Sequence, residues 1–479
     1  MLRTKLKISP LVILVSLYLL ACLLTLGYWH AMDWHYQTGD EPHYLIMASG
    51  IIRHGTLEQT IPYREDYEHP TIYKGWLGSD ANPAKNGHTF VGPHGLFNVH
   101  GIGLPLLLAI PYGIAGVGGA KVFLILLSSC ILVVAWKISS FFIPNRSINF
   151  WSTAAVGLAL PLLLASSQVF TELPAGLFAL IGMYWLLTTD NRRPWTAEVP
   201  MVFAIVFLPW LHIKLLLPGA ILAGAISWKL VREGHPRRRA HLLLGAFIFS
   251  IGLLVMYNEY AFGRLLGPYT EGEFQLSKTS LMVLIGLFLD QAHGFLLQNP
   301  VQFVGLFSIG LLIVTDALAA AVWSALFLAL LVPNGLYDAW YGAWSFVGRF
   351  EWTAAIVFFV PTLLGLARLG SACPRFFSSI IAIGAVIQAQ AYYWYTFRNV
   401  EVINKWGVNV PLPLPPSYSP FYGHLAPLLP VFGNPSWAFH YPPNYLFGVF
   451  ALVVFVGGIW FAARDSKSQV RFAKPSLGN

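Results

Sequence analysis

Charged residues are scarce in this chain: Lys, Arg, Asp and Glu make up 10% of its 479 residues, whereas hydrophobic residues make up 56%. A soluble domain of this length carries more charge, so these values exclude that class and indicate a polytopic membrane protein. The net charge of +8 lies mostly in short basic runs between apolar segments, where it sets membrane orientation. We therefore expect no nucleic-acid partner.

Cysteine is also rare. The three cysteines, Cys22, Cys130 and Cys373, lie far apart in or beside apolar stretches, which indicates neither a disulfide framework nor a metal cluster. The first apolar run follows a basic N-terminus but continues well past Cys22, whereas a processed lipoprotein would turn polar there. This pattern predicts an uncleaved first transmembrane helix rather than a signal peptide.

The apolar runs predict an all-α fold, a polytopic transmembrane helical bundle of about twelve spans with both termini in the cytoplasm. Residues 101–118 are apolar but short, glycine-rich and interrupted by Pro105 and Pro111, and their crossing would reverse the sidedness of every later basic loop. We therefore expect an interfacial or re-entrant helix there, on the outer face. The expected spans are 9–29, 119–141, 149–169, 173–189, 199–213, 215–231, 240–257, 301–315, 317–333, 353–369, 376–395 and 444–463.

The outer side collects most of the polar sequence. The first outer loop, roughly 30–101, includes a helical apolar pattern from Pro42 to His54 that suits the membrane interface. Residues 280–289 are too short to span the membrane. A proline-rich outer loop at 396–443 is too dense in proline for regular helix. We see no internal repeat and no soluble domain.

The most informative pair is Asp40-Glu41, in Thr38-Gly-Asp-Glu-Pro-His-Tyr-Leu45, shortly after the first span. Acidic groups beside hydrocarbon cost free energy, so two adjacent carboxylates at a membrane surface indicate a functional site. The alternative is a solvated acidic loop.

Further polar residues interrupt apolar segments on the same predicted face. A single Lys or Arg near a helix end usually reaches the interface or anchors the helix. Their joint placement on the face that bears Asp40 favours a shared site. These residues are Glu172, His212, Lys214, Asp290, His293 and Arg349.

The residue types suggest their chemistry. We expect Lys214, Arg349, His212 and His100 to bind a donor phosphate, with Arg suited to bidentate contact. Asp40 and Glu41 are the candidate catalytic bases. The remaining candidates bind substrate, the aromatic ones by stacking on a sugar; they are His43, Glu172, Asp290, His293, Trp340, Tyr341 and Trp344. The sequence shows no cofactor and leaves a divalent cation undecided, with Asp40, Glu41, Glu172, His43 and His100 as candidate ligands.

Six motifs give the chain a resemblance to the polytopic GT-C glycosyltransferases, in particular to bacterial protein mannosyltransferases and aminoarabinose transferases. Many relatives have two prolines where this chain has Gly101-Ile102, and often Arg where it has Lys214. The motifs are Gly39-Asp-Glu-Pro-His-Tyr-Leu45, His100-Gly-Ile-Gly-Leu-Pro-Leu-Leu-Leu108, Gln168-Val-Phe-Thr-Glu-Leu-Pro174, Pro209-Trp-Leu-His-Ile-Lys214, Phe288-Leu-Asp-Gln-Ala-His-Gly294 and Trp340-Tyr-Gly-Ala-Trp-Ser-Phe-Val-Gly-Arg349.

The resemblance implies a conserved transmembrane module at 1–257, including the outer loop 30–118 with membrane-parallel helices. A variable C-terminal transmembrane region at 258–479 would carry outer loops 258–300, 334–352 and 396–443. The resemblance also implies a polyprenyl-phosphate sugar donor, an acidic base in the Asp40-Glu41 motif and a lipid, glycan or protein acceptor.

We therefore expect an inverting glycosyltransferase of the bacterial inner membrane, active on its periplasmic or extracellular side. Two other functions stay open at this point. A transporter or flippase for lipid-linked glycans would also place charges within a helical bundle. A glycan ligase would use a diphosphate-linked oligosaccharide in place of a monophosphate-linked sugar. A non-enzymatic envelope subunit is a further alternative.

Overall fold

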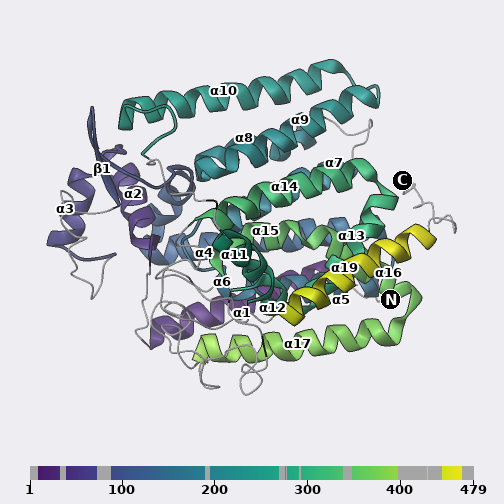
Figure 1. Cartoon of the computed structure of the whole chain (residues 1–479). Coiled ribbons are helices and arrows are strands. Elements are labelled where there is room, and N and C mark those ends of the chain that lie inside the picture. Colours follow the sequence, from purple (N-terminus) through teal and green to yellow (C-terminus); the bar gives the residue numbers. More distant parts are fainter. Residues whose placement is uncertain are drawn as a thin grey trace, which may run out of the picture.

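The computed structural model describes residues 9–32, 39–72, 88–188, 195–268, 276, 278–290, 293–337, 348–397, 429 and 445–465. Most of these residues are helical, and long helices lie side by side along one direction (Figure 1). At one end of the bundle lie α2 (Glu41–His54), α3 (Thr60–Glu68) and the strand β1 (Thr89–Gly92). We call this the hairpin end. The marked chain termini lie toward the opposite end.

Each expected span overlaps one α-helix or, at 149–169 and 353–369, two shorter α-helices. Six helices of the described residues are long and apolar enough to cross a membrane, or up to seven if the bent pair Arg349–Val357 and Phe359–Ala372 is one span. The number of about twelve therefore stays a prediction. The helices that overlap the expected spans are α1 (Pro10–Ala31), α4 (Gly103–Phe142), α5 (Arg146–Gly157), α6 (Leu162–Ala165), α7 (Glu172–Thr188), α8 (Val199–Leu211), α9 (Leu216–Arg232), α10 (Arg237–Phe262), α13 (Phe303–Thr315), α14 (Ala317–Leu336), α15 (Trp352–Val357), α16 (Phe359–Ala372), α17 (Pro374–Phe397) and α19 (Tyr445–Asp465).

The helix α4 (Gly103–Phe142) contains a break that separates its first segment from the following span. Ala115 and Gly116 have non-helical dihedrals, and Gly116 has a φ of 58° with a ψ of −144°. Glycine adopts this region without a Cβ penalty, which explains why the chain bends here. The distinction made from the sequence between residues 101–118 and 119–141 falls at this break. The first segment packs against α2.

A two-stranded antiparallel hairpin adds to the expected all-α fold. β1 pairs with β2 (Gly95–Asn98) in a register that sets Thr89 opposite Asn98 and Gly92 opposite Gly95. The side chain of Phe97 packs in a small core with Ala261 and Phe262 at the end of α10. This packing fixes the hairpin to the helical bundle.

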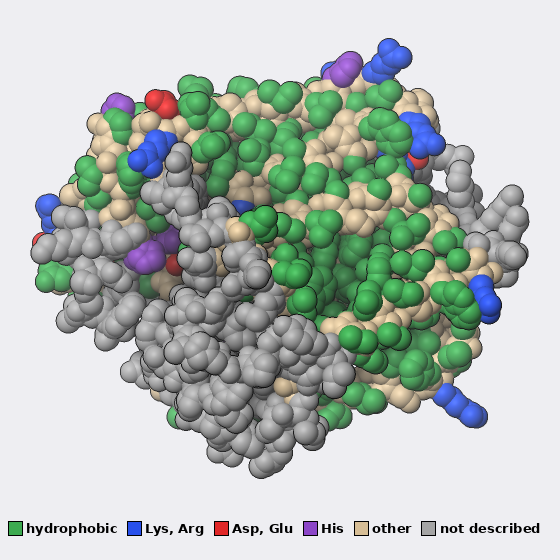
Figure 2. Space-filling model, viewed as in Figure 1, with side chains coloured by type: hydrophobic (Ala, Val, Ile, Leu, Met, Phe, Trp, Pro, Cys, Tyr) green, Lys and Arg blue, Asp and Glu red, His purple; other side chains and the backbone are tan. Residues whose placement is uncertain are grey.

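Charge is distributed unevenly over the bundle. Figure 2 shows hydrophobic side chains over most of the helical surface in view, with several Lys and Arg side chains at the right-hand end. Arg239 at the start of α10 pairs with Glu198, 3.0 Å away, just before α8.

Candidate active site

Asp40 lies at the N-terminus of α2 and has two kinds of partner. Its Oδ2 lies 2.8 Å from Arg349 Nη2, and its Oδ1 lies 3.7 Å from His100 Nε2. Burial raises the pKa of Asp40, but the charges of Arg349 and of the nearby histidines together lower it by more, so the net pKa is well below its usual value. The carboxylate is therefore ionised over the physiological pH range.

Arg349 opens the short helix η6 (Arg349–Glu351), directly after Gly348, whose φ of 75° turns the chain. Its side chain is buried, and its guanidinium lies 4.3 Å from the ring centre of Phe170 and 4.7 Å from that of Phe350. One nitrogen, Nη2, binds Asp40, whereas Nε and Nη1 have no hydrogen-bond partner among the described residues. Two buried donors thus remain for an anion.

Lys214 approaches the same aromatic ring from another helix junction. It lies in η4 (Ile213–Leu215), between α8 and α9, and its Nζ is 5.0 Å from the ring centre of Phe350 and 3.4 Å from Asn334 Oδ1. The backbone N–H of Lys214 donates to His212 Nδ1 at 3.2 Å. The charges of Asp40, His100 and Arg349 also act on His212. The structure therefore brings the four predicted phosphate-binding residues into one neighbourhood.

A close backbone contact holds His100 near this junction. A Cβ atom on Gly101 would lie 2.3 Å from the backbone oxygen of Leu211, so only glycine fits without a shift. The departure from the two prolines of the related motif therefore has a packing reason.

Two buried acids lie near the two cations. Glu172 begins α7, is 5% exposed, and lies close enough to Lys214 and Arg349 to affect both electrostatically. A second acid, Glu351, was not among the residues predicted from the sequence; it is fully buried, and neither of its carboxylate oxygens is hydrogen-bonded within the described part of the chain. Its only sequence signal was its position two residues after Arg349.

Glu41 has partners different from those of Asp40. Its side chain is buried, its Oε1 accepts from the backbone N–H of Val169 at 2.8 Å, and Lys121 Nζ on α4 lies 3.8 Å away. These contacts fasten the first turn of α2 to α4 and to the chain before α7. Glu41 is thus placed to orient the neighbouring Asp40.

Histidines extend the site on the other side of Asp40. His88 Nδ1 lies 3.0 Å from His100 Nε2, and the ring of His43 stacks on His88 with centres 3.8 Å apart. His43 also hydrogen-bonds the hydroxyl of Tyr63. His88 was not among the residues predicted from the sequence. The turn signal Gly92-Pro-His-Gly95 lies midway between His88 and His100 and is consistent with a hairpin that brings these two histidines together.

The remaining predicted residues divide into two groups. Asp290 Oδ1 accepts from the backbone N–H of His293 at 2.9 Å, and a Cβ on Gly348 would lie 2.9 Å from the backbone oxygen of His293. This pair therefore supports the turn that presents Arg349. Trp340, Tyr341 and Trp344 lie outside the described residues, as does the proline-rich loop 396–443 except for residues 396 and 397, which end α17, and residue 429.

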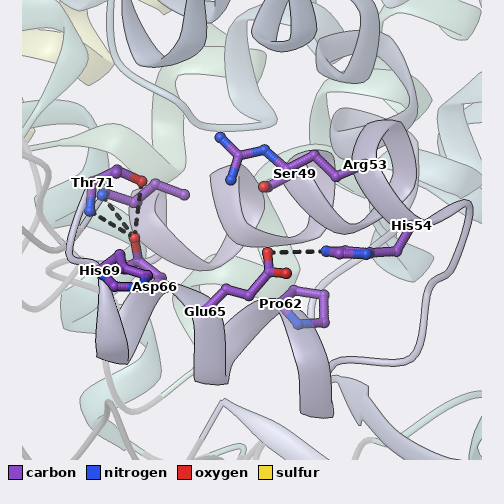
Figure 3. A pocket seen from close by; sticks show the side chains of 9 residues that line it. Ser49, Arg53, His54, Pro62, Glu65, Asp66, His69 and Thr71 are labelled. Atoms are coloured by element: carbon purple, nitrogen blue, oxygen red, sulfur yellow. Dashed lines mark hydrogen bonds and ion pairs between the residues drawn. The ribbon is translucent and has the colours of Figure 1, made fainter.

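A separate cavity of about 280 Å³ lies between α2 and α3. In Figure 3, His54 and Glu65 point toward each other, and their Nε2 and Oε2 atoms are 2.9 Å apart. Asp66 Oδ1 accepts from the backbone N–H groups of Thr71 and Ile72. Because these polar groups are bonded to one another, the cavity is less suited to substrate than the Asp40 neighbourhood.

Comparisons with known proteins support the fold. No protein-family model and no curated sequence matches the chain. The apo crystal structure of ArnT from Cupriavidus metallidurans is similar over 95% of this chain and 74% of that one, with 13% identity and a TM-score of 0.50. A second ArnT structure from that organism, bound to undecaprenyl phosphate, gives 11% identity and a TM-score of 0.45 over 95% and 73% of the two chains. The first likeness confirms the GT-C type of helical fold expected from the sequence.

Proposed function

We propose that this chain is a membrane glycosyltransferase that moves a sugar from a polyprenyl-phosphate donor to an acceptor hydroxyl. The observation that supports this best is the double environment of Arg349. One of its nitrogens binds Asp40, and two others are buried without a partner in the described residues, near a second cation, Lys214. A carboxylate base and an anion-binding pair thus lie side by side, as sugar transfer from a phosphate requires.

The reaction would proceed with inversion. The acceptor oxygen attacks the anomeric carbon from the face opposite the phosphate, the bond from that carbon to the phosphate oxygen breaks, and the phosphate leaves with the electron pair. Asp40 takes the hydroxyl proton. Arg349 and Lys214 stabilise the charge that develops on the departing phosphate. Glu41 orients Asp40, and Glu172 balances the cations. His212 completes the phosphate neighbourhood, whereas His100, which the sequence also suggested for phosphate binding, lies toward the oxygen of Asp40 that does not bind Arg349.

The site lies at the hairpin end, opposite the end where basic residues gather. The positive-inside rule therefore supports a catalytic site on the outer face of a bacterial inner membrane. The lipid tail of the donor would enter laterally from the bilayer between the apolar helices. The acceptor, whether lipid, glycan or protein, is defined only by its hydroxyl.

The test is to incubate purified protein with a panel of radiolabelled polyprenyl-phosphate sugars and candidate acceptors, with and without chelator. We expect transfer of one labelled sugar by the natural protein and none by Asp40→Asn. The matched control is Glu65→Gln, another carboxylate of the hairpin end, which should transfer normally. Movement of lipid-linked sugar across proteoliposomes without transfer, or use of diphosphate-linked oligosaccharide alone, would contradict the proposal.

A further inference from the structure

The base of the hairpin brings two imidazoles to the free side of the Asp40 carboxylate. Thr89 pairs with Asn98, and the backbone N–H of Val99 donates to the backbone oxygen of His88 at 2.9 Å. The hairpin register therefore fixes His88 and His100 next to each other just outside the strands. Arg349 uses Oδ2 of Asp40, and His100 lies toward Oδ1. One carboxylate thus faces a guanidinium on one oxygen and imidazoles on the other.

The three side chains are spaced as ligands of one metal ion. One potential ligand atom from each of Asp40, His88 and His100 lies within 4.8 Å of the others. The two imidazole nitrogens are 3.0 Å apart, and His100 Nε2 is 3.7 Å from Asp40 Oδ1. Metal–ligand bonds of about 2.0–2.1 Å in a tetrahedral site set neighbouring ligand atoms about 3.3 Å apart. Small side-chain adjustments would bring all three atoms to that spacing.

Surrounding contacts hold this arrangement. The His43 ring stacks on His88, and the backbone N–H of His100 donates to Asn98 Oδ1 at 3.0 Å. Asn98 Nδ2 in turn donates to the Tyr63 hydroxyl, which also bonds His43. Such outer partners orient the ligands of protein metal sites.

Resting on the proposed function, we propose that Asp40, His88 and His100 bind one Zn²⁺ ion beside the acceptor position. Two imidazoles and one carboxylate suit Zn²⁺, whereas Mg²⁺ and Ca²⁺ prefer oxygen ligands. The side chains of Asp40 and His100 are 20% and 15% exposed, which leaves access for a fourth ligand. An acceptor hydroxyl in that position would be more acidic and would lie next to Asp40, its proton acceptor.

The test measures metal binding directly on the full chain in detergent. Chelator-treated protein is titrated with Zn²⁺ by calorimetry, and with Co²⁺ as an absorption probe of ligand geometry. We expect one ion per chain in the natural protein and in the control His54→Gln, a histidine of the same end that pairs with Glu65. His88→Gln should weaken binding by more than about 100-fold, the upper range for loss of a mere outer partner. His100→Gln provides the same comparison if His88→Gln does not fold.

Failure to bind one equivalent of metal, or equal binding by His88→Gln and His54→Gln, would overturn the Zn²⁺ site. Neither result touches the proposed transferase function, because transfer is assayed separately with the donor panel. Conversely, a protein that binds Zn²⁺ through these residues but transfers no sugar would overturn the function and leave the metal site standing.

Discussion

Replacement of Arg349 by glutamine tests the core of the proposed site. The change removes the positive charge 2.8 Å from Asp40 and leaves a shorter, neutral polar side chain. Breaking a buried ion pair on one side destabilises a protein by about 3–5 kcal/mol, because the remaining charge is left without compensation. Loss of a donor aimed at developing negative charge lowers the rate by roughly 10²–10³-fold. We expect both effects in Arg349→Gln.

The pH dependence of the variant separates its catalytic effect from general damage. In the natural protein, burial raises the pKa of Asp40, and Arg349 is the main group that lowers it below the usual value. Without Arg349 the main charge that lowers the pKa is gone, so the pKa of Asp40 rises and the base becomes protonated at a higher pH than in the natural protein. As the pH is lowered, residual kcat/KM of Arg349→Gln should therefore begin to fall at a higher pH than kcat/KM of the natural protein.

Two measurements and one control complete the test. Chemical denaturation in detergent gives the free energy of unfolding, and the labelled-donor assay gives kcat/KM. Arg239→Gln removes a similar ion pair, 3.0 Å long, near the opposite end of the bundle and should transfer normally. The double variant Asp40→Asn/Arg349→Gln should be less destabilised than the sum of the single variants, because the uncompensated charge is gone. Near-normal transfer by Arg349→Gln would refute this assignment.

Three further predictions follow from neighbouring contacts. Burial lowers the pKa of His100 to about 4, against about 6.5 in the unfolded chain, so the unfolded chain takes up the proton first as the pH falls. With chelator present, acidification from pH 7 to 5 should therefore lower the free energy of unfolding by about 2 kcal/mol through this residue. Denaturation of His100→Gln, measured over the same pH range, should lack that contribution. Lys121→Met should destabilise the fold by about 3–5 kcal/mol by leaving Glu41 buried without its cation, and the added change Glu41→Gln should recover much of the unfolding free energy. Gly101→Ala should lower the free energy of unfolding by about 1–3 kcal/mol and reduce sugar transfer, because the new Cβ would meet the backbone of Leu211. Gly118→Ala, where a Cβ would meet open space, should change neither quantity in the denaturation and transfer assays.

The helices were predictable because their signals are local. Runs of apolar residues mark the spans, and the glycines and prolines near α4 mark a separate first segment, since periodicity and turn residues act within a few positions. The same local reasoning placed Asp40, Lys214 and Arg349 at helix ends. The span count stays a prediction because α5, at 12 residues, and α15, at 6, are too short to define a crossing.

The partners within the site required tertiary structure. Nothing near Asp40 in the sequence indicates that its cation is Arg349, or that Glu41 accepts a hydrogen bond from the backbone of Val169. The hairpin illustrates why. β1 and β2 have four residues each, too few for a clear strand signal in the sequence, yet the register that pairs Thr89 with Asn98 decides which histidines meet. Residue types thus predicted the chemistry, and long-range packing decided its geometry. The GT-C resemblance could not supply this geometry either, because His88 belongs to none of its motifs and Gly101 departs from one. The two residues flank the hairpin, because His88 directly precedes β1 and Gly101 lies between β2 and α4, so the features that distinguish this chain's site from the general pattern are concentrated at the base of the hairpin.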